Sequence, residues 1–150
     1  MTQELLTQFQ AATTEFVNVA RALPDEKLNW VPAPGEWPAT YVIHHLADAD
    51  AQFLVRFLNV LSVDNPRIIP FDEAVFPSSL HYEGRDIATS LAAVEASCAQ
   101  LVEILGQIDD SSWERTGVHE ERGILTLSQL LQLTTNHRVE HTVHLKGLIA

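Results

Sequence analysis

The sequence has few cysteines and few basic residues, and each shortage excludes certain structural features or partners. Cys98 is the single cysteine, so the 150-residue chain can form no intramolecular disulfide, and nothing indicates an oxidising compartment. Nine Lys and Arg oppose twenty Asp and Glu, which gives a net charge of −11. Because phosphate binding needs clustered Lys and Arg, this balance argues against nucleic acid and against anionic membrane surfaces as partners.

Long hydrophobic runs are also missing from the chain. The N-terminus is polar and the apolar runs are short, so we expect neither a signal peptide nor a transmembrane segment. Hydrophobic residues make up 46% of the sequence, and its length suffices to bury one core without disulfides. We therefore expect a single cytoplasmic domain covering residues 1–150.

No segment shows a strand pattern, and the apolar residues recur at helical spacing instead. This spacing predicts four helices, at residues 2–22, 38–61, 86–107 and from Thr126 to near the C-terminus. Thr126 and Gln129 form a capping-box pattern, which marks the start of the last helix. A long irregular crossover, residues 64–82, joins the second helix to the third. The sequence therefore predicts an all-α fold, a four-helix bundle.

Two kinds of residue that could carry chemistry have a simpler structural interpretation. Trp30 and Trp37 lie in a turn-rich connection, and we expect them to close one end of the core, because large aromatic side chains mostly bury area. Cys98 falls inside the apolar stripe of the third helix. We expect it to be buried and not to act as a nucleophile, since its flanks offer no positive charge.

The last helix carries an unusual group of histidines. His137 and His141 are four residues apart, so their rings lie on the same helical face, and His144 continues the stripe. Such a pair can supply two imidazole nitrogens to one metal ion. A third ligand must come from elsewhere in the chain.

The candidate third ligand lies in the second predicted helix. His44 and His45 are adjacent there, so they point about 100° apart and only one of them can face the bundle axis. The neighbouring apolar residues Val42 and Ala49 favour His45, and we expect His44 at the flank or surface. Bundle cores are established places for metal sites built from facing helices.

These motifs resemble those of the DinB/YfiT-like superfamily. Trp37 followed by the run His45–Ala49 is similar to the family's helix 2 motif, and the run His137–Leu145 is similar to its second motif. The resemblance covers nearly the whole chain in order and spacing. It implies an antiparallel four-helix bundle with a long crossover between helices 2 and 3. It also implies a divalent metal, zinc or nickel, bound by His45, His137 and His141.

The chain departs from the family pattern at two points, and one further residue has an open role. Pro38 replaces the serine that usually caps helix 2, and Glu140 replaces a histidine that often precedes the last ligand. A shift of register would let His144 replace His137 as a ligand; Glu140 itself is expected at the surface. Asp48, three residues after His45, could orient a ligand imidazole or act as a general base, or could be a solvated helix residue.

The resemblance implies a metal-dependent enzyme acting on a small molecule. The metal would activate either a low-molecular-weight thiol cosubstrate, as in an S-transferase, or water, as in a hydrolase. The sequence shows no second nucleophile and no arginine-rich pocket, and its low basic content makes a highly anionic cosubstrate less natural. The alternative is a non-enzymatic bundle that binds metal or dimerises in a stress response. A homodimer is compatible with either function.

Overall fold

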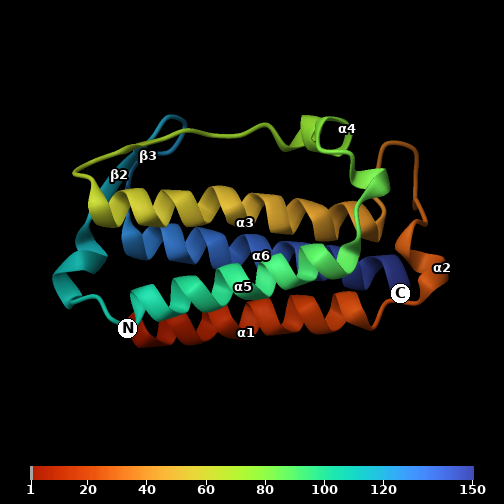
Figure 1. Cartoon of the computed structure of the whole chain (residues 1–150), viewed down its shortest axis with the longest axis horizontal. Helices are drawn as coiled ribbons and strands as arrows, with labels where there is room; N and C mark the ends of the chain where they lie inside the picture. The colour runs from red at the N-terminus through yellow and green to blue at the C-terminus, as the bar shows by residue number, and fades with distance from the viewer. Residues whose placement is uncertain (1) are drawn as a thin grey trace.

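The computed structural model describes residues 2–150 and shows a four-helix bundle, as predicted (Figure 1). The long helices are α1 (Thr2–Arg21), α3 (Ala39–Ser62), α5 (Ile87–Leu105) and α6 (Leu127–Ile149). Three of the connections carry the short helices α2 (Asp25–Leu28) and α4 (Phe76–Ser79) and the 3-10 turns η1 (Glu73–Val75), η2 (Tyr82–Gly84) and η3 (Asp110–Glu114).

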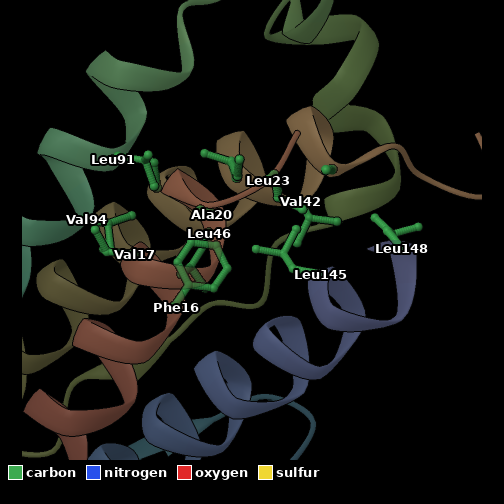
Figure 2. Close-up of a cluster of buried hydrophobic side chains, with 13 residues drawn as sticks. Phe16, Val17, Ala20, Leu23, Val42, Leu46, Leu91, Val94, Leu145 and Leu148 are labelled. Carbon is green, nitrogen blue, oxygen red and sulfur yellow. The ribbon is translucent and has the colours of Figure 1, made fainter. Parts of the chain in front are cut away.

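Two buried hydrophobic clusters, one in each half of the bundle, show how the helices run. The first joins the C-terminal parts of α1 and α6 to the N-terminal parts of α3 and α5, with Phe16, Leu145, Val42 and Leu91 among its members (Figure 2). The second cluster joins the opposite ends of the same helices. Hence α1 and α6 run in one direction, and α3 and α5 run in the other.

Each helix therefore has one parallel and one antiparallel neighbour. α1 lies beside α6 and α5, α3 lies beside the same two helices, and the pairs α1–α3 and α5–α6 are diagonal. Only α1–α5 and α3–α6 are antiparallel contacts. Parallel α3 and α5 explain the long crossover, because the chain must return along the whole of α3, roughly 36 Å for 24 residues, before α5 can begin (Figure 1).

The prediction that the chain has no strands was wrong. β1 (Arg67–Ile68) pairs in parallel with β2 (Thr116–His119), which pairs antiparallel with β3 (Gly123–Thr126). Strands of two to four residues are too short to show a period in the sequence. Gly117 allows β2 to approach the bundle, since a Cβ there would lie 2.8 Å from Ile68 Cδ1 and 3.0 Å from Val60 Cγ2.

Several local predictions were tested by the structure. The capping box of α6 is confirmed, because Thr126 Oγ1 accepts the Gln129 N–H and the Gln129 side chain accepts the Thr126 N–H. Cys98 is buried, as expected. The prediction that Trp30 closes one end of the core was wrong, because 43% of its surface is exposed and Lys27 lies over its ring. Trp37 is half-buried against the first cluster.

Helix α5 is long and apolar enough to cross a membrane by length and composition alone. In the structure it lies against α1 and α3, where Leu91, Val94 and Leu101 are buried in the bundle. One face of its apolar surface is thus buried in the bundle core.

A buried ion pair holds α3 against α6. Arg138 donates to Asp50 Oδ2 at 2.8 Å, and both side chains are almost fully buried. The Arg138 guanidinium also lies over the ring of Phe9, 4.2 Å from its centre, so the pair reaches from α3 through α6 to α1. Burial raises the pKa of Asp50 to about 6, although the positive charge of Arg138 opposes that rise.

We expect Arg138→Met to lower the free energy of unfolding by about 3–5 kcal/mol at pH 7.5, because it leaves the Asp50 carboxylate buried without its partner. Urea denaturation measures the loss. Combining it with Asp50→Leu should restore part of the stability, because no buried charge then remains. A single variant no less stable than the double variant would contradict this account.

Candidate metal centre

Three histidine rings from two neighbouring helices meet inside the bundle. His45 comes from α3, and His137 and His141 come from successive turns of α6. His137 Nε2 lies 3.1 Å from His45 Nε2 and 3.1 Å from His141 Nε2. His45 is fully buried, and the other two are half-buried. One nitrogen of each ring lies within 4.8 Å of the other two, so the structure brings together the three residues that were named as candidate ligands.

The convergence of the three nitrogens fits a shared cation. A neutral imidazole nitrogen is either one donor or one acceptor, so His137 Nε2 cannot satisfy both neighbours by hydrogen bonding alone. Two nitrogens bound to zinc at about 2.0–2.1 Å with a tetrahedral angle lie about 3.3 Å apart, close to the observed separations. The Nδ1 atoms of His45 and His137 are buried and have no partner within residues 2–150, so both rings interact through Nε2.

The surroundings keep the three rings neutral. Burial lowers the pKa of His137 to about 2, assisted by the positive charge that His141 and His45 would carry. Burial likewise lowers the pKa of His141 to about 4, and it lowers the pKa of His45. Near neutral pH all three imidazoles are therefore unprotonated on one nitrogen, the form in which histidine binds metals.

Two aromatic side chains hold the rings in place. The Trp37 ring lies 5.2 Å from that of His45, and Phe53 meets His137 edge-on at 5.2 Å between ring centres. Trp37 thus contacts the histidine cluster as well as the core.

Sequence analysis missed Glu73, a carboxylate at this cluster. Glu73 Oε2 lies 3.2 Å from His45 Nε2, and 56% of its side chain is exposed. The residue belongs to η1 in the crossover, where no periodic pattern relates it to the histidines. It can be found only once the path of the crossover is known.

The other candidate residues lie outside the cluster. The His144 ring is centred 6.4 Å from that of His141, and the three-histidine group does not include it. Asp48 accepts two hydrogen bonds from Arg85, at 2.6 and 3.0 Å, and in the part of the chain that the structure describes it makes none to the three histidines. Glu140 is exposed, as predicted.

The placement of His44 at the surface was wrong. His44 is fully buried, and its Nδ1 lies 2.8 Å from Ser90 Oγ on α5. α3 is covered on two sides, by α6 and by α5, so the rotation of about 100° between adjacent residues turns His45 toward one neighbour and His44 toward the other.

The fold and the histidine cluster together define a class of protein. It is a four-helix bundle in which α3 and α5 are parallel and three histidines lie between α3 and α6, the second and fourth long helices. The chain belongs to the DinB superfamily, whose sequence pattern matches residues 8–145. A relative named "Putative metal-dependent hydrolase" from Oceanobacillus iheyensis is 28% identical over 87% of this chain and 76% of its own length. The relative "Putative metal-dependent hydrolase YfiT" from Bacillus subtilis is 27% identical over 97% of this chain and 80% of its own.

Solved structures agree on the fold. The Bacillus subtilis YfiT structure, described as a probable metal-dependent hydrolase with an unusual four-helix bundle topology, has a TM-score of 0.89 at 24% identity, over 98% of this chain and 85% of that one. A mycothiol-dependent maleylpyruvate isomerase has a TM-score of 0.79 at 14% identity, over 97% of this chain and 60% of that one. The family match confirms the predicted superfamily, and the solved structures confirm the fold.

We expect the metal-stripped protein to lose stability as the pH falls below about 6.5. The folded pKa values of the three histidines are lowered, so the unfolded chain binds more protons, and each histidine adds a slope of at most about 1.4 kcal/mol per pH unit. The loss begins near pH 6.5 and continues to about pH 4 for His141. Urea denaturation at pH 7.5, 6 and 5 measures it.

Replacing His137 by Gln should reduce this dependence by removing one of the groups that cause it, whereas His144→Gln, outside the cluster, should keep it. Asp50 contributes the opposite slope, because its folded pKa is raised, but it is one group against five, since burial also lowers the pKa values of His44 and His119. A free energy of unfolding that stays constant from pH 7.5 to 5 in the wild-type protein would show that the histidines are not held neutral.

Proposed function

We propose that this protein is a metal-dependent enzyme acting on a small molecule, with a divalent cation, zinc or nickel, bound by His45, His137 and His141. The observation that carries the proposal is the convergence of three neutral Nε2 atoms, 3.1 Å apart in two of the pairs. Three protein ligands are typical of catalytic zinc sites, which keep a further position open, whereas structural sites are closed by four.

The proposed chemistry divides between the cation and a nearby carboxylate. A divalent cation at this place would act as a Lewis acid and lower the pKa of a water or thiol beside it. Glu73 would accept the proton that the water or thiol loses, because its carboxylate already reaches the cluster and its other side faces solvent. Asp48, the carboxylate expected in this role, would instead position Arg85.

Thiol and water remain two versions of the proposed reaction. The relatives' names mention metal-dependent hydrolysis, and the isomerase of similar fold is mycothiol-dependent. Both reactions remove a proton from a small nucleophile, so one arrangement of histidines and Glu73 serves either. A cytoplasmic location, where such thiols are kept reduced, and a homodimer are further parts of the proposal.

We expect elemental analysis of untagged protein to find about one divalent metal ion per chain. His45→Ala and His141→Ala should lose the metal, with circular dichroism confirming that the helices remain. His144→Ala is the matched control and should retain it, because its ring lies outside the cluster. No metal in the wild-type protein, and no uptake of zinc or nickel, would sink the enzyme proposal and favour a non-enzymatic bundle.

We expect Glu73→Gln to lower kcat by roughly 10²–10⁴-fold while the zinc content is unchanged, because the proton acceptor is lost. The assay screens the zinc-loaded protein with activated esters, and with thiols plus an electrophile. Asp48→Asn should have the smaller effect, since Arg85 engages both of its oxygens. The reverse order of the two losses would identify Asp48 as the base.

A further inference from the structure

A cavity of about 250 Å³ opens beside the histidine cluster. Its lining joins α3, α6 and the β2–β3 hairpin, and it includes His137, one of the three proposed metal ligands. Part of the wall is apolar, with Phe53, Phe57 and Leu130 among its residues. The rest is polar, and two arginines stand out there.

Arg56 and Arg122 are the two arginines in this cavity, and they differ from the other arginines of the chain. Five others form ion pairs with Asp or Glu: Arg21, Arg67, Arg85, Arg115 and Arg138. Within residues 2–150, neither Arg56 nor Arg122 has a carboxylate within 4.0 Å, although acidic residues outnumber basic ones by twenty to nine. The two guanidinium groups that have no carboxylate partner among the described residues thus both line this cavity.

Arg56 is held in position without being neutralised. Its Nη2 donates to the carbonyl oxygen of Ile69 at 2.9 Å, and its guanidinium lies 5.3 Å and 5.2 Å from the ring centres of Phe53 and Phe71. Burial lowers the pKa of Arg56, and the positive charge of Arg122 lowers it further. An anion between the two groups would relieve both costs.

His119 adds a neutral hydrogen-bond donor to the lining. Its Nδ1 accepts the backbone N–H groups of Glu121 and Arg122, at 3.1 and 3.3 Å, so the ring proton resides on Nε2. That Nε2 makes no hydrogen bond within the described chain. Glu140 is the one acidic residue in the lining, and it is exposed.

We propose that this cavity binds the anionic group of the substrate, a carboxylate, between Arg56 and Arg122. The apolar part of the molecule would lie along the phenylalanine and leucine side chains and extend toward His137. The inference rests on the proposed function and adds the chemical class of its substrate, a small organic acid. Sequence analysis found no arginine-rich pocket, because Arg56 lies in α3 and Arg122 in the turn before β3, and only the fold brings them together.

The test is a titration of the full-length protein with benzoate, followed by ¹H–¹⁵N NMR, with benzamide as the uncharged analogue of the same shape. Benzoate should bind at least about tenfold more tightly than benzamide, because charge-assisted hydrogen bonds to guanidinium are stronger than neutral ones. Arg56→Gln and Arg122→Gln should each weaken benzoate binding about tenfold. Arg21→Gln, which removes an exposed arginine paired with Glu95, should leave it unchanged.

The same titration after removal of metal by a chelator separates the cavity from the histidine cluster. Binding of benzoate that persists without metal and depends on both arginines supports the inference, even in a sample that takes up no zinc and so refutes the proposed function. Equal binding of benzoate and benzamide would overturn the inference. Benzoate binding that requires the metal and is unchanged by both arginine substitutions would also overturn the inference.

Discussion

The contact between α3 and α6 governs the functional arrangement of this protein. These two antiparallel helices share a fully buried ion pair, Asp50 with Arg138, and the histidine cluster lies beside it along the same contact. A buried charge pair has little tolerance for displacement, because either partner left alone pays the full cost of desolvation. Sliding α6 along α3 would therefore break the ion pair at the same time as it separated His45 from His137.

The directions of the helices determine what surrounds the cluster. Because α3 and α5 are parallel neighbours, the chain must return along α3, and that return path brings Glu73 and Phe71 to the helix that carries His45 and Arg56. The connection before α6 forms the hairpin that supplies His119 and Arg122. The histidine nitrogens of the cluster thus come from helices, whereas Glu73 and the cavity residue Arg122 come from connections.

Local patterns in the sequence predicted the helices and the histidines well, and for a physical reason. Helical periodicity indicates which face of α1, α3, α5 and α6 is buried, so the helices could be predicted without a structure. The spacing of His137 and His141 is about one helical turn, so their placement on one face could be predicted as well. The structure places His45, and not His44, in the cluster. The error about His44 arose because sequence periodicity shows one buried face, whereas α3 is covered by two neighbours.

Features that depend on the path of irregular segments could not be predicted. Glu73 reaches His45 through a crossover without periodicity, Arg85 takes both oxygens of Asp48 from the end of that crossover, and the strands are too short to leave a pattern. The pairing of Asp50 with Arg138 could not be predicted either, because both helices carry other charged residues and the sequence does not indicate which of them meet.

Gly117 lies where the β2–β3 hairpin packs closely against Ile68 and Val60. A Cβ at this position would lie 2.8 Å from Ile68 Cδ1 and 3.0 Å from Val60 Cγ2, so either these side chains or the hairpin would have to shift. A shift of β2 would displace His119 and Arg122 of the cavity lining, whereas the three histidines lie on α3 and α6. The placement of two cavity residues thus depends on a hydrogen atom in place of a methyl group, at a residue that is itself neither in the cavity lining nor in the histidine cluster.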